Sequence, residues 1–387
     1  MSRTSATFAP PVMEARRWLA DVEFSPERPL INVSQAAPVE PPHPDLRAAM
    51  AAALEDTATH LYGPVLGMPG LRAELAEQWS ASYGGRIVPE QVAITSGCNQ
   101  AFSAAISTLC DEGDDVILPT PYYFNHRMWL DMAGVRTVPL PCGPGLLPAA
   151  EDAAALITPQ TRAIALVSPN NPTGVEYPPE TLEAFYALCE AHGIALILDE
   201  TYRDFHSAPG APHGLFRHEA WPDTFIHLYS FSKAYRLTGH RVGAIMTSEA
   251  RMAEVEKFLD TVSVCPSQLG QRAALWGMQH LGQWLAGERD EILARRAAIE
   301  TGFPRLAARG WELLGAGAYF AYVRFPHEMR SDAFAQMLVE KAAILCLPGT
   351  MFEPGGYGAR ELRIAYANID VAGVEELFDR LLEITPE

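Results

Sequence analysis

The chain has 387 residues, of which 48% are hydrophobic; this is enough for a large core and, at roughly 150 residues per domain, predicts about two domains. Its 29 basic and 47 acidic residues give a formal net charge of −18, which argues against a general affinity for nucleic acid or acidic membrane surfaces. The six cysteines show no zinc-binding spacing, and no secretory signal or membrane span is predicted. We therefore expect a reduced, cytoplasmic protein without a metal site.

The first half of the chain predicts an α/β domain behind an N-terminal arm. Residues 1–45 are rich in proline and are expected to lie outside the main sheet. From about residue 92 to 229, β-rich runs alternate with helix-like stretches, as in βαβ units wound around a mostly parallel sheet. A crossover helix is expected between Pro179 and Gly193, and Pro119 is expected to end a strand. The predicted strands cover residues 92–95, 116–118, 163–167 and 194–198.

From about residue 285 the pattern changes to that of a smaller α+β domain. A charged helix is expected around residues 288–300, ending before Pro304, and is followed by a strand at 319–323 and a helix near 332–341. A loop rich in glycine and proline at 348–358 then leads to a strand at 362–365. We predict an N-terminal arm (1–45), a large domain with a doubly wound sheet (46–284), and a C-terminal part (285–387) that forms the small domain together with the arm.

Only three of the basic residues are lysines, and one of them differs in its surroundings. Lys257 and Lys341 follow glutamates in helix-like segments, whereas Lys233 follows the apolar run 225–229 with no carboxylate nearby in the sequence. An amine that is partly withdrawn from water loses its proton more easily and can act as a nucleophile that forms a Schiff base. Lys233 is therefore the first candidate for a catalytic residue.

Polar residues follow the predicted strands directly. In open doubly wound sheets, ligands bind beyond the carboxyl ends of the strands, so these residues are candidates for one shared site. Each has an ordinary explanation as a turn or a helix cap, but their joint position favours a function. The set comprises Gly97, Cys98, Asn99, Tyr122, Tyr123, residues 170–174, Asp199, Glu200, Thr201, Tyr202, Ser230, Ser232 and Lys233.

Part of this set predicts a phosphate site. Backbone N–H groups at a glycine turn that opens a helix form an anion cradle, and the planar fork of an arginine can hold a phosphate through two bonds. The groups expected to bind the phosphate are the backbone at Gly97, Cys98 and Asn99 and the side chains of Ser230, Ser232 and Arg241.

The remainder of the set predicts a pyridine ring. A carboxylate at Asp199 can face a ring nitrogen, Tyr123 can provide an aromatic plate, and Lys233 can capture an aldehyde carbon. Together with the phosphate cradle, these residues predict pyridoxal 5′-phosphate as the cofactor.

The motifs resemble those of the fold-type I, class I/II aminotransferases. They extend over nearly the whole chain from about residue 30, and the segments 170–174 and 230–241 are individually specific. The resemblance implies an enzyme that uses pyridoxal phosphate to transfer an α-amino group from an amino acid to a 2-oxo acid by a ping-pong cycle. The matching motifs are Tyr62-Gly63-Pro64-x-x-Gly67-x-x-Gly70-Leu71-Arg72, Ser96-Gly97-Cys98-Asn99, Ser168-Pro169-Asn170-Asn171-Pro172-Thr173-Gly174, Asp199-Glu200-x-Tyr202, Ser230-x-Ser232-Lys233 followed by Arg241, and Leu362-Arg363-Ile364-Ala365.

The resemblance also implies roles for single residues around the cofactor. Lys233 is expected to hold the cofactor as a Schiff base and then to shuttle a proton from the substrate Cα. Asp199 is expected to keep the ring nitrogen protonated, Asn171 and Tyr202 to bond the phenolic oxygen, and Tyr123 to stack on the ring.

Two further roles concern the substrate and the assembly. Arg363, aided by Asn171, is expected to bind the substrate α-carboxylate through a bidentate pair. Tyr62 is expected to reach the phosphate of the neighbouring subunit, which implies a homodimer with shared active sites. Where many family members have a glycine-bearing Gly-x-Pro segment, this chain has Ser34-Gln35-Ala36-Ala37-Pro38.

Other interpretations stay open at this point. A β-eliminating C–S lyase on the same scaffold begins with the same proton abstraction, so the residues above do not separate it from an aminotransferase. A serine acyl enzyme using Ser230-x-x-Lys233 is a remote alternative, because the companion motifs are absent. No motif nominates a second arginine for a dicarboxylate. The aromatic residues around Tyr62, Tyr122 and Phe124, together with His126, suggest a pocket for an apolar or aromatic side chain, although such clusters more often belong to the core.

Overall fold

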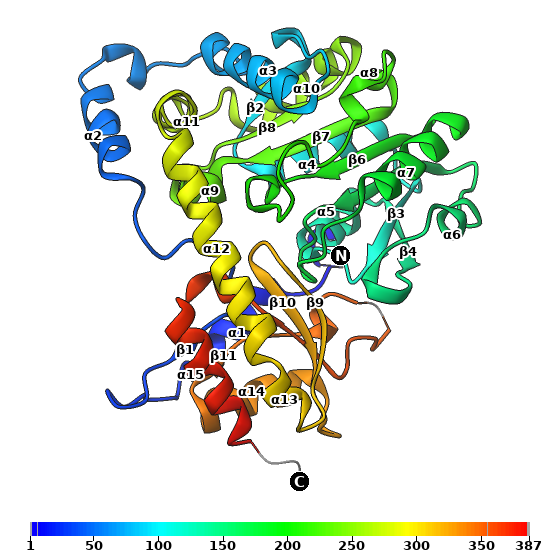
Figure 1. The fold of residues 1–387 in the computed structure, drawn as a ribbon. Coiled ribbons are helices and arrows are strands. Elements are labelled where there is room, and N and C mark those ends of the chain that lie inside the picture. Colours follow the sequence, from blue (N-terminus) through cyan, green and yellow to red (C-terminus); the bar gives the residue numbers. More distant parts are fainter. Residues whose placement is uncertain (1, 6, 354, 385–387) are drawn as a thin grey trace.

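The computed structural model describes residues 2–5, 7–353 and 355–384 and divides into two layered parts, as Figure 1 shows. The upper part contains a seven-stranded sheet in the order β2-β8-β7-β6-β5-β3-β4, in which every strand but β8 runs in one direction. The predicted doubly wound, mostly parallel sheet is therefore confirmed. In chain order the strands are β2 (Val92–Thr95), β3 (Asp115–Thr120), β4 (Arg136–Pro141), β5 (Thr161–Val167), β6 (Ala195–Asp199), β7 (Phe225–Ser230) and β8 (Gly243–Met246).

Helices cover both faces of this sheet, which explains why its strands are continuous apolar runs. On β5, Ile164 and Leu166 pack into one core with α3, α7 and α11, while Ala163 and Ala165 pack into a second core with α4, α5 and α10. The helices of this part are α2 (Pro44–Ala53), α3 (Pro69–Tyr83), α4 (Cys98–Leu109), α5 (Phe124–Ala133), α6 (Ala150–Ala154), α7 (Pro179–His192), α8 (Trp221–Thr224), α9 (Phe231–Ala234), α10 (Glu249–Ser263) and α11 (Gln268–His280).

The lower part is an α+β layer in which a four-stranded antiparallel sheet, β12-β13-β10-β9, packs against helices. Its strands are β9 (Glu312–Gly317), β10 (Phe320–Arg324), β12 (Leu347–Pro348) and β13 (Glu361–Ile364). Its helices are α12 (Gly282–Gly302), α13 (Pro304–Ala307), α14 (Ser331–Ala342) and α15 (Val371–Leu382).

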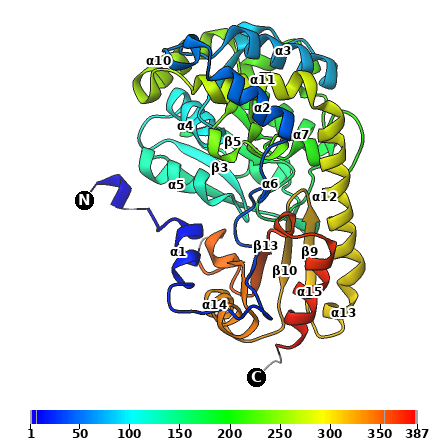
Figure 2. The same cartoon turned by 90° about the vertical axis from the view of Figure 1, so that its left-hand side faces the viewer.

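The N-terminal arm lies outside the large sheet, as expected, but it is not irregular throughout. It contains α1 (Pro11–Arg17) and the short strand β1 (Ile31–Asn32), which pairs in parallel with β11 (Ile344–Leu345). Figure 2 shows α1 beside the lower part of the molecule and α2 packed near α11. Because Ile31, Val33 and Ala36 are buried in the lower core, the arm and the C-terminal part share one hydrophobic core.

Two predicted boundaries differ from the structure. Pro119 does not end its strand: β3 continues to Thr120, because its pairing with β5 stops at Ile117 and the proline, which lacks an N–H, pairs only with β4. The charged helix begins at Gly282 rather than near residue 288.

This long helix, α12, connects the two parts. Trp284 and Leu285 near its start pack against the upper core, whereas Ile292 and Ile299 are buried in the lower core. We propose domain boundaries at residues 45 and 284. The two separate hydrophobic cores support this division, and the second boundary lies inside the continuous helix α12.

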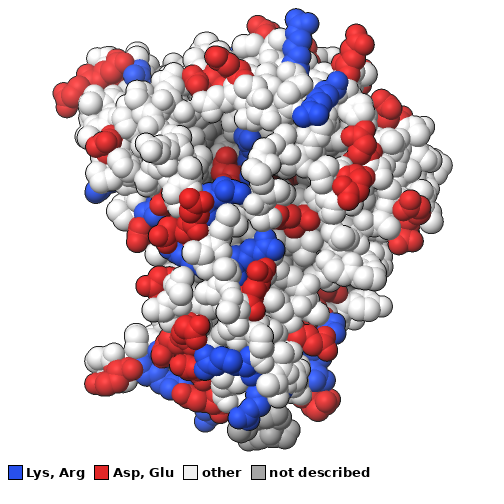
Figure 3. Space-filling model, viewed as in Figure 1, with Lys and Arg blue, Asp and Glu red and all other residues white. Residues whose placement is uncertain are grey.

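On the face seen in Figure 3, acidic and basic side chains are interspersed over both parts of the molecule. None of the described helices combines the length and apolarity needed to cross a membrane.

Candidate active site

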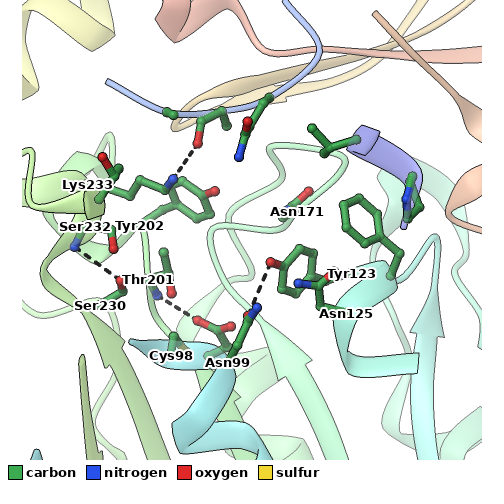
Figure 4. A pocket seen from close by; sticks show the side chains of 18 of the residues that line it. Cys98, Asn99, Tyr123, Asn125, Asn171, Thr201, Tyr202, Ser230, Ser232 and Lys233 are labelled. Atoms are coloured by element: carbon green, nitrogen blue, oxygen red, sulfur yellow. Dashed lines mark hydrogen bonds between the residues drawn. The ribbon is translucent and has the colours of Figure 1, made fainter. Parts of the chain in front are cut away.

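A pocket of about 410 Å³ opens where β2, β5, β6 and β7 end, and the N-terminal arm closes one side of it. Figure 4 shows Ser230, Ser232 and Lys233 on one side of this pocket and Tyr123 with Asn125 on the other. The structure thus brings together side chains that are far apart in the sequence. The predicted site residues that line the pocket are Cys98, Asn99, Tyr123, Asn171, Asp199, Tyr202, Ser230, Ser232, Lys233, Arg241 and Arg363.

Lys233 lies on α9, directly after the end of β7. Its Nζ donates a hydrogen bond to the backbone carbonyl of Ala36 in the arm. Burial lowers the pKa of Lys233 to about 7, and the positive charges of Arg363 and Arg241 add to this shift. A large share of the amine is therefore unprotonated and nucleophilic at neutral pH.

Asp199 ends β6 and is buried at the floor of the pocket. The backbone N–H of Thr201 donates to its Oδ1 at 2.9 Å, and Nε2 of His126 lies 3.3 Å from its Oδ2. Burial alone would raise the pKa of Asp199, but the neighbouring His126 and Thr201 hold this pKa below its usual value. The carboxylate therefore stays ionised although it is withdrawn from water.

Gly97 joins β2 to α4 in a conformation that requires glycine. Its φ of 86° lies in the left-handed region, and a Cβ there would collide with the guanidinium of Arg241. Two backbone carbonyls, at 3.1 and 3.3 Å, hold this guanidinium, which makes no ion pair within the described ranges. The amino end of α4, the guanidinium and the hydroxyls of Ser230 and Ser232 thus form a concave set of anion-binding groups.

Arg363 reaches the pocket from β13 and is almost completely buried. Its Nη1 donates to Oδ1 of Asn171 at 2.9 Å, and its Nη2 donates to the carbonyl of Ser34. The guanidinium carbon also lies 4.9 Å from the ring centre of Phe320 and 5.0 Å from that of Phe352. Burial lowers the pKa of Arg363 to about 10, so the group remains charged at neutral pH.

Two tyrosines complete the pocket wall. Tyr123 donates to Oδ1 of Asn99 at 3.4 Å, and Tyr202 packs edge-on against Phe320 with the ring centres 5.2 Å apart. Burial raises the pKa of both phenols, so they stay protonated and can donate hydrogen bonds. Tyr62, by contrast, does not line the pocket and is 84% exposed.

Thr201 belongs to the predicted set at the strand ends and His126 to the predicted aromatic pocket, but the contact of either residue with Asp199 was not predicted. Thr201 follows Asp199 by two residues, which is the spacing of a local side-chain-to-backbone hydrogen bond and could have indicated the contact. His126 lies on α5, stacked on Phe102 with the ring centres 3.8 Å apart. No local spacing connects it with Asp199, so only the fold reveals this pair.

The geometry does not support a serine–lysine pair. The Oγ of Ser230 accepts a hydrogen bond from the backbone N–H of Ser232 at 3.2 Å and thereby caps α9. The amine of Lys233 is directed instead at Ala36.

Comparisons with known proteins identify the family. The model of the family "Aminotransferase class I and II" matches residues 28–381. The arginine–pyruvate transaminase of Pseudomonas aeruginosa is 32% identical over 351 residues, which cover 88% of this chain and 86% of that protein. The valine–pyruvate aminotransferase of Mycobacterium tuberculosis is 31% identical over 389 residues, which cover 96% and 95% of the two chains.

The fold agrees with these sequence matches. The crystal structure of an aminotransferase from Mycobacterium tuberculosis superposes with a TM-score of 0.88 at 28% identity and covers 98% of this chain and 97% of that chain. The names of the two relatives specify different amino donors, arginine and valine. The chain belongs to the class I and II aminotransferases, and it is an enzyme that transfers amino groups.

Proposed function

We propose that this aminotransferase binds pyridoxal 5′-phosphate in the pocket at Lys233 and moves the α-amino group of an amino acid to a 2-oxo acid in two half-reactions. The main support is that three groups line one pocket: the Lys233 amine with a pKa of about 7, the ionised and buried carboxylate of Asp199, and Arg241, which pairs with no carboxylate among the described residues.

The residues present fit this cofactor. Arg241, the amino end of α4 and the hydroxyls of Ser230 and Ser232 suit a phosphate, and Gly97 leaves the room that the guanidinium needs. Asp199 suits a protonated ring nitrogen, since a buried carboxylate is stabilised by a cationic partner.

When bound, pyridoxal phosphate supplies an aldehyde carbon for an amine and an electron-withdrawing ring that stabilises negative charge on the substrate Cα. The Nζ of Lys233 would be the amine that holds this aldehyde carbon in the absence of substrate. With substrate bound, the same Nζ would take the proton from the substrate Cα as a general base. Its pKa of about 7 suits both tasks at neutral pH.

The neighbours of Lys233 orient and hold the reacting groups. Tyr202 and Asn171 can hydrogen-bond the phenolic oxygen of the cofactor, and Tyr123 can cover the ring. We assign the substrate α-carboxylate to Arg363, because this buried guanidinium makes only neutral contacts among the described residues.

We also propose a cytoplasmic homodimer. Tyr62 is too exposed to serve its own pocket, and an exposed aromatic residue next to the exposed Leu61 suits a subunit contact. In the dimer, Tyr62 would contribute to the phosphate site of the partner subunit.

An amino-acid panel tests the proposed function. The purified holoenzyme is incubated with single amino acids, and its visible spectrum is followed together with the release of pyruvate and ammonia. Transamination predicts conversion of the cofactor to its amine form without release of ammonia, followed by recovery when a 2-oxo acid is added. Stoichiometric ammonia and pyruvate from a sulfur-containing amino acid would instead identify a β-eliminating lyase.

A further inference from the structure

At one contact between the two domains, backbone meets backbone without an intervening side chain. Residues 173–174, in the loop that follows β5, lie against Gly315 and Gly317 of β9 in the small domain. We propose that these two glycines are positioning residues: their lack of a side chain sets the distance between Arg363 and Asn171, and thereby the width of the site for the substrate α-carboxylate. This inference rests on the proposed function.

The first support is how closely the two backbones approach each other. A Cβ on Gly317 would collide with the carbonyl oxygen of Gly174, and a Cβ on Gly315 would lie 2.7 Å from the carbonyl oxygen of Thr173. A Cβ on Gly174 would in turn lie 2.5 Å from the backbone nitrogen of Gly317. Neither Gly315 nor Gly317 has a positive φ, so the requirement for glycine there is steric and does not come from the backbone conformation. A larger residue at either position must push the domains apart.

The second support is the register of the small sheet. In the pairing of β9 with β10, Gly317 lies opposite Phe320 and Gly315 lies opposite Tyr322. In the pairing of β10 with β13, Tyr322 lies opposite Arg363, so one row of the sheet leads from a glycine of the contact to this arginine. The ring of Phe320 also packs 4.9 Å from the guanidinium carbon of Arg363. Because hydrogen bonds join the three strands, a shift of β9 away from the loop would also move Arg363.

The third support is that the loop on the other side of the contact is held in place and carries Asn171. Oδ1 of Asn170 accepts hydrogen bonds from the backbone N–H of Thr173 at 3.1 Å and from its hydroxyl at 2.8 Å. The N–H of Gly174 donates to the carbonyl of Asn170 at 2.8 Å. Asn171 accepts the 2.9 Å hydrogen bond from Arg363. This hydrogen bond and the glycine contact therefore join the same two parts of the molecule, and they should change together.

Polar contacts hold the domains together directly beside the glycines. Arg296 of α12 pairs with Glu176 of the large domain at 3.3 Å. Arg289 of the same helix donates to the carbonyls of His206 and Ser207, both at 2.8 Å. Since this attraction acts next to the glycines, the separation of the domains at this point is limited by the backbone contact itself.

The test compares Gly317→Ala and Gly315→Ala with the matched control Ala316→Gly in the same strand. The control gives the strand additional backbone freedom without adding an atom at the contact. Affinity for pyridoxal phosphate is measured by equilibrium dialysis, and affinity of each holoenzyme for the unreactive monoacid butyrate is measured by calorimetry. We expect G317A to lose at least about tenfold in butyrate affinity, because paired hydrogen bonds to a carboxylate require fixed geometry. Its kcat/KM for the best donor of the amino-acid panel should fall roughly 100-fold.

G315A should show a smaller loss of butyrate affinity, because its overlap with the loop backbone is smaller, and A316G should show none. Affinity for pyridoxal phosphate should be unchanged in all three variants, since none of the three residues lines the pocket. This difference between the two ligands separates positioning of Arg363 from a general loss of structure.

Equal butyrate affinities of G317A and A316G, or a parallel loss of affinity for pyridoxal phosphate in G317A, would overturn the inference. Arg363→Met distinguishes this failure from a failure of the proposed function. Loss of butyrate binding in R363M but not in G317A would reject the inference alone. Retention of butyrate binding in R363M would reject the proposed α-carboxylate site and the inference with it.

Discussion

Lys233 is chemically useful because the fold lowers its pKa to about 7, and no carboxylate of a described residue pairs with the amine. Burial and two nearby guanidinium groups favour the neutral form, while the carbonyl of Ala36 accepts a hydrogen bond from the amine. Lys257, which pairs with Glu254 at 2.7 Å and is largely exposed, has neither feature. The difference between the two lysines is thus a property of the fold, and it can be measured.

Labelling of the cofactor-free enzyme with an amine-selective reagent should reveal the lowered pKa of Lys233. Below its pKa of about 7, Lys233 carries a proton and reacts slowly; above it, the amine is neutral, so its labelling rate should rise between about pH 6 and 8 and then level off. An unperturbed lysine, with a pKa of about 10.4, should keep gaining reactivity through this range. Mass spectrometry of the labelled peptides gives the profile of Lys233. A labelling rate of Lys233 that keeps rising above about pH 8 would contradict the lowered pKa.

His126 is expected to affect catalysis through its influence on the pKa of Asp199. Replacing His126 with asparagine leaves the carboxylate buried but removes the ring that holds its pKa down, so the pKa of Asp199 should rise. We expect kcat to fall roughly tenfold and the acidic limb of the pH–activity profile to move to higher pH. The control is His280→Asn, since His280 is also stacked on an aromatic ring but lies on the surface. Equal pH profiles for the two variants would show that His126 does not control the ionisation of Asp199.

Among the secondary-structure elements, the turn between β2 and α4 gives the most direct link between a sequence motif and the geometry of the pocket. Gly97→Ala strains the backbone at a positive φ, and its new methyl group would collide with Arg241. Gly113→Ala strains the backbone similarly, at a φ of 92°, but its methyl group would meet no neighbouring atom. Both variants should lose about 1–2 kcal/mol in the free energy of unfolding. Affinity for pyridoxal phosphate, measured by equilibrium dialysis, should fall at least about tenfold in G97A alone. Equal affinities of the two variants for pyridoxal phosphate would show that Gly97 is needed only for the backbone conformation of the turn.

Much of the large domain was predictable because its signals are local. Each of the strands β2, β5, β6 and β7 is a short apolar run with polar residues at its carboxyl end, and helix α7 begins after Pro178 and ends before Gly193. Parallel pairing then brings the strand ends to one edge, which is why most of the predicted site residues line one pocket.

The parts that the sequence did not predict depend on contacts between distant segments. β1 and β11 are each two residues long and are strands only because they pair with each other. Arg16 and Gln35 enter the pocket because the arm is fixed to the small domain, and nothing in their local sequence indicates this. Pro119 misled the prediction because the sequence does not reveal which side of β3 lacks a partner at that position.

At the scale of the whole molecule, the pocket needs three parts of the chain at once. The large domain contributes Lys233 and Asp199, the small domain contributes Arg363, and the arm contributes Arg16 and the carbonyl of Ala36. The continuous helix α12 connects the two cores, so the relative position of the domains determines the separation of the reacting groups.

In the proposed homodimer, the second subunit also contributes a residue to each active site. Sedimentation should give about twice the chain mass of 42.3 kDa. Lys233→Ala and Tyr62→Ala should each be impaired alone, whereas a refolded mixture should regain activity, because a hybrid dimer combines an intact Lys233 with an intact Tyr62 from the partner in one site. A mixture no more active than the sum of its components would argue against shared sites.

We propose that Lys233 alone captures the cofactor, and the small number of lysines allows this to be measured directly. The holoenzyme is reduced with borohydride, digested and examined by mass spectrometry for the pyridoxyl group on each of the three lysines. We predict the group on Lys233 only, its absence from Lys233→Ala, and its retention in Lys257→Ala and Lys341→Ala. A pyridoxyl group on Lys257 or Lys341 of the wild type, or a cofactor still covalently fixed in Lys233→Ala, would contradict the account.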